Sequence, residues 1–291
     1  KDEKKKIYDI IKRPGNLFSG PLQYKRKDPA TGDDFMGKIQ LTGADNARDL
    51  GGIRTADGAV IRKGYLIRSN RLSRITKKDI QILKDQYHLH KIIDLRTPME
   101  VEQEEDKKIT GAVYLNIPFF VESMVGISHE KGNRHKMGHL EDIPKMEDLY
   151  VMIVENPFCQ KQMEKALRQI MTTKDGAVLW HCTEGKDRCG LLSAMTLFLL
   201  GVPEEDVIED YLKTNTFAAK RIDKMYQKWR SLGISKGRAE GMLGLFMAKE
   251  EYIEAALDSV RKTYGSIVLF LRDALEISDD EKESFREKVL R

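Results

Sequence analysis

The sequence is poor in cysteine, with three in 291 residues, and an odd number of cysteines does not suit a disulfide framework. It also lacks an apolar run near the roughly 20 residues that a membrane-spanning helix needs, since the nearest one, residues 191–200, is too short. Neither sign of charge dominates, because 50 Lys and Arg face 46 Asp and Glu, which gives a net charge of +4. We therefore expect no transmembrane segment, no disulfide scaffold and no nucleic-acid partner.

The chain does have the length and the 41 % hydrophobic content of a folded domain. Residues 1–38 are the exception, because prolines, glycines and many lysines predict an irregular, solvated leader. Residues 39–291 are expected to form one domain. The first residue is Lys1 rather than methionine, which leaves open a removed signal peptide and hence either a cytoplasmic or a secreted location.

Short apolar runs and helical patterns alternate along the domain. Asp57-Gly58 lies between two alternating segments and predicts a β-hairpin. Helices are predicted after the capping motifs at Thr76 and Ser278 and in an apolar run that ends at Gly201. Three apolar runs predict buried strands, at residues 91–96, 112–117 and 177–182. Strands interleaved with helices predict an α/β fold, a three-layer sandwich around a central, partly parallel sheet.

The segment WHCTEGKDRCG (180–190) holds two of the cysteines at the junction between a predicted strand and a predicted helix. A nucleotide-binding P-loop needs Gly-x-x-x-x-Gly-Lys-[Ser/Thr], and here Asp187 stands in the last position. A metal site fails because His181 and Cys182 are adjacent, so their side chains leave a strand on opposite faces. A redox pair would need Cys-x-x-Cys spacing. None of these three kinds of site fits the segment.

A nucleophilic cysteine does fit. The backbone amides of the loop, the N-terminus of the next helix and two neighbouring cations all favour the thiolate of Cys182. A thiolate ringed by N–H donors can attack a phosphorus atom held there, and the planar guanidinium of Arg188 can bind two phosphoryl oxygens. His181 is expected to orient the loop, since a thiolate needs no base.

His-Cys-x5-Arg is the signature of cysteine-dependent phosphatases. HCTEGKDR (181–188) resembles the loop His-Cys-x-x-Gly-Lys-Asp-Arg of the atypical bacterial tyrosine phosphatase family. The resemblance extends from residue 39 to the end. Four further blocks resemble the family's in the family's order: NARDLGG (46–52), LIRSNRLS (66–73), IIDLRTPME (92–100) and DYLKTN (210–215).

The resemblance implies hydrolysis of phosphate monoesters through a phosphocysteine on Cys182, with a phosphorylated protein or a phosphoinositide as substrate and no cofactor. Phosphotyrosine is the first choice, since some members of the family also accept phosphoserine, phosphothreonine and phosphoinositides. The side of the loop that faces phosphate is expected to be formed by Thr183, Glu184, Gly185, Lys186 and Cys189 together with Arg188.

The resemblance places the proton donor on Asp187. The cations Lys186 and Arg188 on either side favour its ionised form, whereas a bound phosphate dianion favours the protonated one. Asp94, at the end of a predicted strand, is therefore kept as a second candidate. Lys186 is expected at the rim of the site, where its charge would widen acceptance toward phosphoinositide headgroups.

Several residues are expected to support the loop rather than act on substrate. Within NARDLGG, either Arg48 or Asp49 is expected to contact the loop, against the alternative that the block is simply a glycine-rich turn. Asp94 is expected to support the loop more than to transfer a proton. No metal site is expected, because the pair His135 and His139 is interrupted by a glycine and has no evident third ligand.

Cys189 departs from the family pattern, which has Ser or Thr after the arginine. Because a thiol donates hydrogen bonds weakly, Cys189 predicts slower breakdown of the phosphocysteine. Two other interpretations stay open: a small residue packed under the loop, and a thiol that forms a disulfide with oxidised Cys182.

The segment 216–262 is helical and is not needed to complete a sheet, so it predicts a lid over the site; ordinary core packing is the alternative. Two other functions compete with a protein phosphatase. One is a phosphoinositide phosphatase. The other is a phosphate-binding pseudoenzyme, against which the retention of both Cys182 and Arg188 argues.

Overall fold

The computed structural model describes residues 37–121, 124 and 145–291. The expected leader lies outside the described residues apart from residues 37 and 38, and so do His135 and His139. Among the residues that the structure describes, no helix combines the length and apolar composition that spanning a membrane requires.

A five-stranded, mostly parallel sheet forms the centre, in the order β1-β2-β5-β3-β4. Only β1 runs antiparallel, against β2. The register sets Asn70 of β2 opposite Cys182 of β5, and Asp94 of β3 opposite His181, so polar residues gather at the carboxyl ends of three adjacent strands. The strands are β1 (Arg48–Asp49), β2 (Leu66–Asn70), β3 (Lys91–Asp94), β4 (Val113–Asn116) and β5 (Val178–Cys182).

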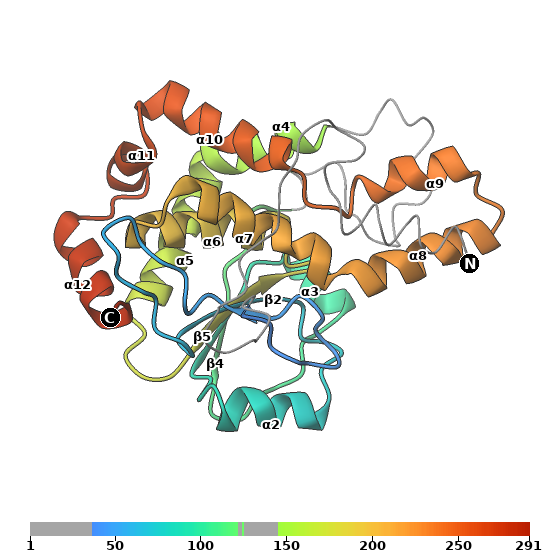
Figure 1. Ribbon diagram of the computed structural model, residues 1–291, viewed down its shortest axis with the longest axis horizontal. Coiled ribbons are helices and arrows are strands. Elements are labelled where there is room, and N and C mark those ends of the chain that lie inside the picture. The colour runs from blue at the N-terminus through green and yellow to red at the C-terminus, as the bar shows by residue number, and fades with distance from the viewer. Residues whose placement is uncertain (1–36, 122–123, 125–144) are drawn as a thin grey trace.

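Helices cover both faces of the sheet, which confirms the predicted α/β sandwich (Figure 1). Neighbouring residues of a strand pack into two separate cores, one on each face of the sheet. Leu179 packs in the core that lies between the sheet and α2, whereas Trp180 packs in the core formed with α4–α7 and α10–α12. The helices are α2 (Lys77–Asp85), α3 (Pro98–Gln103), α4 (Met146–Glu155), α5 (Pro157–Met171), α6 (Asp187–Leu200), α7 (Glu204–Phe217), α8 (Ala219–Ser231), α9 (Lys236–Leu243), α10 (Glu250–Tyr264), α11 (Ile267–Asp273) and α12 (Asp279–Val289).

The predicted helix ends have the expected caps. Thr76 and Ser278 each close a capping box, before α2 and α12, and Gly201 ends α6 with a φ of 81°. The predicted hairpin is shorter than expected, because the turn at Asp57-Gly58 is flanked by one isolated bridge, Arg54 with Val60. The backbone of Val60 instead exchanges two hydrogen bonds with Arg291, so the end of the chain takes the place of a longer partner strand.

Helices α8 and α9 form a pair that extends from the side of the molecule, hereafter the α8–α9 arm (residues 219–243) (Figure 1). The arm has its own apolar cluster, separate from the two cores beside the sheet. It is built from four arm residues and the residue just before the arm: Ile222, Tyr226, Ala239, Leu243 and Ala218. The apolar residues of this segment are therefore used in part for packing within the arm itself.

Candidate active site

The segment after β5 forms a tight loop that leads directly into α6. Cys182 is the last residue of β5 and is buried, and Asp187 is the first residue of α6. Gly185 has a φ of 68°, and a Cβ there would lie 2.6 Å from the carbonyl oxygen of Ser69, so no other residue fits without displacing β2. The first amides of α6 have no partner within the helix, which makes this junction suited to an anion.

Asn46 holds the outer side of this loop. Its Nδ2 donates to the carbonyl oxygens of Glu184 and Gly185, each at 3.0 Å. Arg68 Nη2 donates to the same Gly185 oxygen at 2.9 Å. In a trans peptide the N–H points away from the C=O. Because the carbonyls of Glu184 and Gly185 are bound on the outer side of the loop, the N–H groups of residues 185 and 186 point to its inner side. A loop that binds an anion needs its N–H groups in this orientation.

A buried ion-pair network fixes Asn46 and Arg68 in turn. Asp210 of α7 pairs with Arg48 Nε at 2.9 Å and with Arg68 Nη1 at 2.6 Å. Burial and the charge of Arg68 lower the pKa of Arg48 to about 10. Burial alone would raise the pKa of Asp210, but the two arginines outweigh burial and lower it far below its usual value.

Arg48 donates to Asn46 Oδ1 at 2.6 Å, which agrees with the expectation that either Arg48 or Asp49 supports the loop. The alternative, Asp49, contacts a different part of the chain. Its carboxylate accepts the backbone N–H groups of Gly51 and Gly64, at 2.8 and 2.7 Å, and so stabilises the turn between β1 and β2. The side chain points to that turn because Asp49 follows Arg48 on a strand, where neighbouring side chains alternate.

Arg188 of α6 pairs with Glu100 of α3 through both terminal nitrogens, Nη1 to Oε2 at 2.5 Å and Nη2 to Oε1 at 2.7 Å. Burial would raise the pKa of Glu100, but Arg188 outweighs it and lowers the pKa to about 2. The hydroxyl of Thr183 also donates to this carboxylate, and the ring of Phe120 lies 4.8 Å from the guanidinium. A guanidinium has five N–H donors, and the two bonds to Glu100 use two of them. Two more make only long contacts of 3.4 Å, with the carbonyl oxygen of Leu95 and the hydroxyl of Thr183, so these two and Nε–H are the donors that a phosphoryl group can engage.

Asp187 lies among hydroxyl and ammonium donors. Tyr150 of α4 donates to Oδ1 at 2.6 Å, and Lys186 Nζ lies 3.2 Å from the same oxygen. The expectation that the ammonium of Lys186 lies at the rim of the site is wrong, because the side chain is buried and Nζ donates to the carbonyl oxygen of Leu245 at 2.6 Å. Its direction is set by the segment between α9 and α10, which supplies that carbonyl.

The loop is also bound to the α8–α9 arm. Glu184 forms an ion pair with Arg221 of α8, and its other oxygen lies 3.6 Å from Arg71 Nη1. Arg221 within the arm and Leu245 just after it thus both contact residues of the loop. A displacement of the arm would change the loop's surroundings.

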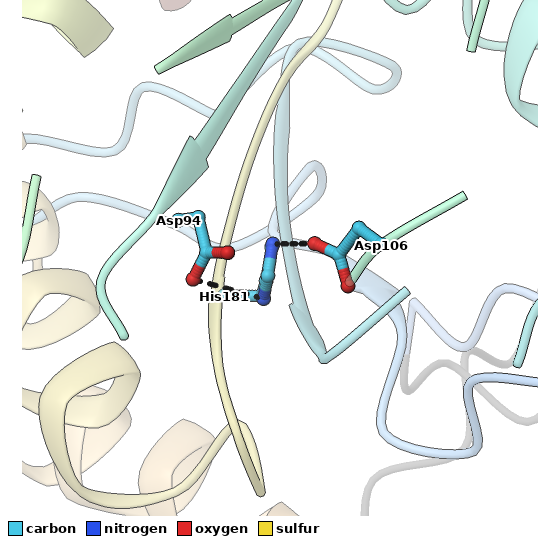
Figure 2. A group of neighbouring side chains, drawn as sticks. All are labelled: Asp94, Asp106 and His181. Atoms are coloured by element: carbon cyan, nitrogen blue, oxygen red, sulfur yellow. Dashed lines mark ion pairs between the residues drawn. The ribbon is translucent and has the colours of Figure 1, made fainter. Parts of the chain in front are cut away.

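Beneath the loop lies a buried charge cluster around His181 (Figure 2). The imidazole stands between Asp94, 3.8 Å from Nδ1, and Asp106, 2.8 Å from Nε2; the closer contact is an ion pair that lacks the alignment of a hydrogen bond. Although burial lowers the pKa of His181, the two carboxylates outweigh it and raise the pKa above 6.5. His181 Nδ1 also lies 3.2 Å from the carbonyl oxygen of Cys182, which agrees with a loop-orienting role.

Asp94, Asp106 and His181 have the donor types and spacing of a metal site. The guanidinium of Arg96 already pairs with both carboxylates, at 2.7 Å to Asp94 and 3.1 Å to Asp106. The chain thus supplies the compensating positive charge itself. Burial raises the pKa of Asp94, but His181 and Arg96 outweigh it and lower the pKa to about 2, a value that suits a structural carboxylate and not a proton donor.

Cys189 is fully buried under the loop. Its Sγ donates to the carbonyl oxygen of Trp180 at 3.6 Å and accepts a hydrogen bond from the backbone of Ser69. The expectation of slower phosphocysteine breakdown assumed that the residue after the arginine donates to the sulfur of Cys182, and the Cys189 thiol donates to Trp180 instead. Burial raises the pKa of its thiol to about 11. The packing interpretation agrees with this environment, and a contribution of the Cys189 amide to anion binding stays a prediction.

Several side chains that build the site lie outside the loop motif and were not predicted individually. They lie in the other blocks that resemble the family, and that resemblance did not indicate what each residue does: Asn46, Arg68, Glu100 and Asp210. For Glu100 a local signal also exists, because Thr97 and Glu100 form a capping box at the start of α3, and the same carboxylate then reaches Arg188.

Comparison with known proteins agrees with this geometry. A triple specificity protein phosphatase, PtpB of Mycobacterium tuberculosis, is 27 % identical over 270 residues, which cover 82 % of this chain and 94 % of the relative. A Cupriavidus necator protein named for tyrosine-protein phosphatase activity is 29 % identical over 235 residues, covering 80 % of this chain and 82 % of the relative. Residues 39–291 match the model of the tyrosine phosphatase family, and the chain is therefore an enzyme of that family.

Proposed function

We propose that this enzyme hydrolyses phosphate monoesters, with phosphotyrosine as its first-choice substrate, through a phosphocysteine on Cys182. One arrangement supports the proposal above all. Cys182 ends β5, and the backbone amides that follow it lead into the N-terminus of α6. Arg188 lies in the first turn of that helix, where Glu100 orients its guanidinium. Membership of the family already implies a phosphorylated substrate.

In the first step the thiolate of Cys182 attacks phosphorus, and the bond between phosphorus and the ester oxygen breaks. Asp187 gives its proton to the departing oxygen, which leaves as an alcohol or phenol. The amides of residues 183–188 and the guanidinium of Arg188 bind the three equatorial oxygens while charge is redistributed in the transition state. In the second step water attacks phosphorus, Asp187 takes a proton from that water, and the S–P bond breaks to restore the thiolate and release phosphate.

Asp187 is preferred over Asp94 as the proton donor because of their surroundings. Asp94 accepts hydrogen bonds from Arg96 and Tyr114, and its pKa of about 2 keeps it ionised. Asp187 keeps 14 % of its side chain exposed and belongs to the loop itself. A phosphate dianion bound in that loop would favour the protonated form of the neighbouring carboxyl group.

A phosphoinositide phosphatase is the alternative within enzymes. The name of the relative PtpB, a triple specificity phosphatase, favours a broad substrate range. Lys186 gives no support for lipid headgroups as substrates, since its ammonium is buried against Leu245. Phosphotyrosine therefore stays the first choice.

The test compares kcat/KM for a phosphotyrosine peptide, a phosphoserine peptide and a panel of phosphoinositides, with the Cys182→Ser variant as the control. We expect the highest value for phosphotyrosine and no turnover by Cys182→Ser, which should still bind inorganic phosphate because its amides and Arg188 remain. Higher values for phosphoinositides would establish the lipid alternative. Turnover by pure Cys182→Ser would exclude the phosphocysteine, and wild-type binding of phosphate without any turnover would indicate a pseudoenzyme.

A further inference from the structure

The Asp187 carboxylate is bound unevenly, since both of its closest donors meet one oxygen. Tyr150 Oη lies 2.6 Å from Oδ1, and Lys186 Nζ lies 3.2 Å from the same Oδ1. Tyr150 belongs to α4 and is fully buried, so its hydroxyl has little freedom to move away. The sequence gives no hint of this contact, because Tyr150 and Asp187 are 37 residues apart.

The Tyr150 hydroxyl is itself held by a second tyrosine. Its oxygen lies 2.7 Å from the Tyr211 hydroxyl of α7. A phenol has one proton, and Tyr150 directs it to the carboxylate, so Tyr211 must be the donor in the pair of hydroxyls. The oxygen of Tyr211 also takes part in a hydrogen bond with the backbone of Lys249, whose N–H can only donate. The hydrogen bonds thus run in one direction, from the start of α10 to Asp187.

Both phenols keep their protons at any ordinary pH. Burial, followed by the negative charge of Asp187, raises the pKa of Tyr150 well above 10, and the same two causes raise the pKa of Tyr211. The two residues are therefore fixed hydrogen-bond donors and not acids that lose their proton during turnover. Any part that their hydroxyls have in the reaction is therefore to orient Asp187, at the end of this series of hydrogen bonds.

We propose that Tyr150 is a positioning residue that determines which oxygen of Asp187 carries the proton given to the leaving group. Because two donors contact Oδ1, that oxygen acts as an acceptor, and the proton of the neutral carboxyl group is carried by Oδ2. The hydrogen bond from Tyr150 also fixes the rotation of the carboxyl group, so that Oδ2 is directed at the oxygen of the leaving group. Tyr211 supports this by holding the Tyr150 hydroxyl in place. The inference rests on the proposed function, in which Asp187 protonates the departing oxygen.

The consequence concerns the leaving group of the substrate. Protonation matters most when the departing oxygen is basic, as in phenyl phosphate, and little when it is a stable anion, as in 2,4-dinitrophenyl phosphate. Loss of the Tyr150 hydroxyl should therefore slow the two esters unequally. A purely structural role of Tyr150 would slow both by the same factor.

The test measures kcat/KM of Tyr150→Phe on both esters, because this ratio covers only the steps up to loss of the leaving group and not the breakdown of the phosphocysteine, which both esters share. We expect kcat/KM for phenyl phosphate to fall about 10-fold or more, a part of the roughly 10²–10⁴-fold that a general acid contributes. We expect kcat/KM for 2,4-dinitrophenyl phosphate and inhibition by inorganic phosphate to stay within about threefold of wild type. Equal losses on both esters, or no loss on either, would overturn the proposal.

Two tyrosine variants control the result. Tyr252→Phe removes a hydroxyl whose ring lies 5.8 Å from that of Tyr150 but which donates to the carbonyl oxygen of Gly244, so it should affect both esters equally or not at all. Tyr211→Phe should show the same selective loss as Tyr150→Phe but to a smaller extent. If Tyr150→Phe does not fold, the comparison of Tyr211→Phe with Tyr252→Phe decides, and equal behaviour of these two would reject the proposal.

Asp187→Asn separates this inference from the proposed function. If Asp187→Asn slows phenyl phosphate selectively and Tyr150→Phe does not, Asp187 is the donor and the role given to Tyr150 is wrong. If Asp187→Asn also lacks selectivity, the proposed proton donor itself is wrong, and the inference falls with it. Selective loss in both variants is the expected result.

Discussion

Both terminal nitrogens of Arg188 contact the carboxylate of Glu100, at 2.5 and 2.7 Å. The contact joins the first turn of α6 to α3, 88 residues earlier in the chain. Because the pKa of Glu100 is lowered to about 2, this ion pair persists throughout the pH range in which a phosphatase works. The guanidinium is thus oriented before any substrate arrives, which is the condition for strong stabilisation of a transition state.

We predict that Arg188→Lys lowers kcat by roughly 10²-fold or more, the typical loss for one donor that acts in the transition state, since an ammonium cannot bind two oxygens in one plane. Glu100→Gln should lower kcat by about 10-fold, because it leaves the arginine in place but removes the charge that orients it. Steady-state kinetics on a phosphotyrosine peptide measure both.

The matched control is Glu102→Gln, which removes an exposed carboxylate from the same helix and should leave kcat unchanged. A loss below about threefold for Arg188→Lys would mean that the arginine has only a structural role.

The network of Asp210 with Arg48 and Arg68 predicts a large loss of stability when its carboxylate is removed. Asp210→Ala leaves two buried arginines without their partner, and we expect the free energy of unfolding to fall by about 3–5 kcal/mol, as measured by urea denaturation. Glu209→Ala, which removes an exposed partner of Lys213 on the same helix, should cost at most about 1 kcal/mol.

The pH dependence of this loss has a definite sign. The folded pKa of Asp210 lies below its ordinary 3.8, so the stabilisation is complete above that pH and disappears as the pH falls through the folded value. Wild type and Asp210→Ala should therefore converge in stability only in acid. An equal difference between them at neutral pH and in strong acid would show that the effect comes from packing.

His181 predicts the opposite trend. Its folded pKa is raised above 6.5 by Asp94 and Asp106, so the imidazolium contributes stability that is complete below pH 6.5 and is lost as the pH rises through the folded value. The free energy of unfolding of wild type should fall as the pH rises from 6.5 through the folded pKa of His181. His181→Gln should have a lower free energy of unfolding at low pH and should depend less on pH. Parallel profiles of the two proteins would contradict this prediction.

The fold followed from local signals that are visible in the sequence, whereas much of the site did not. Apolar runs located β3, β4 and β5, and the capping boxes at Thr76 and Ser278 fixed two helix starts. The loop motif located Cys182 and Arg188 because their spacing is short. The sequence alone could not assign Glu100 to Arg188, because that contact depends on how α3 and α6 meet in space.

The direction of the Lys186 side chain is a second feature of the site that the sequence could not predict. Its place in the loop motif indicated a cation near phosphate, but the direction of a long side chain depends on which carbonyl oxygens lie within its reach. The segment between α9 and α10 offers that of Leu245 at 2.6 Å, and no periodicity in the sequence predicts this approach. For Asp49, alternation along the strand was available as a signal and would have separated it from Arg48.

The contacts between the loop and the α8–α9 arm predict that the arm closes over the site when it is occupied. We expect cleavage near Leu232, which is 69 % exposed at the end of α8, to slow when saturating tungstate occupies the loop as a phosphate analogue. Limited chymotrypsin digestion followed by mass spectrometry measures the rate. The ion pair of Glu184 with Arg221 provides the coupling.

Glu184→Gln tests that coupling, because it removes the charge that holds Arg221 and should speed cleavage both with and without tungstate. Its matched control is Glu240→Gln, an exposed carboxylate on α9, which should change neither rate. Cleavage at the same rate with and without tungstate in wild type would mean that the arm only packs and does not act as a lid.

The buried thiols give the last prediction. Burial raises the pKa of both Cys159 and Cys189 to about 11, so at neutral pH few of these groups are thiolates, the form that reacts with alkylating agents. We expect iodoacetamide to inactivate the native enzyme by labelling Cys182 before the other two, with one equivalent incorporated at complete inactivation. Peptide mapping locates the label. Rapid labelling of Cys189 would show that its environment is more open than its burial indicates.

Cys189→Ser then separates packing from redox protection. A serine hydroxyl can donate to the carbonyl oxygen of Trp180 in place of the thiol, so kcat and the burst of product should stay within about threefold of wild type. After peroxide treatment, the activity that dithiothreitol restores should also match that of wild type. The Cys189 thiol is hydrogen-bonded to the backbone of Trp180 and Ser69 and is therefore not directed at Cys182. Poorer recovery of Cys189→Ser, with a Cys182–Cys189 disulfide detected in oxidised wild type, would show that the loop rearranges on oxidation and that Cys189 protects the nucleophile.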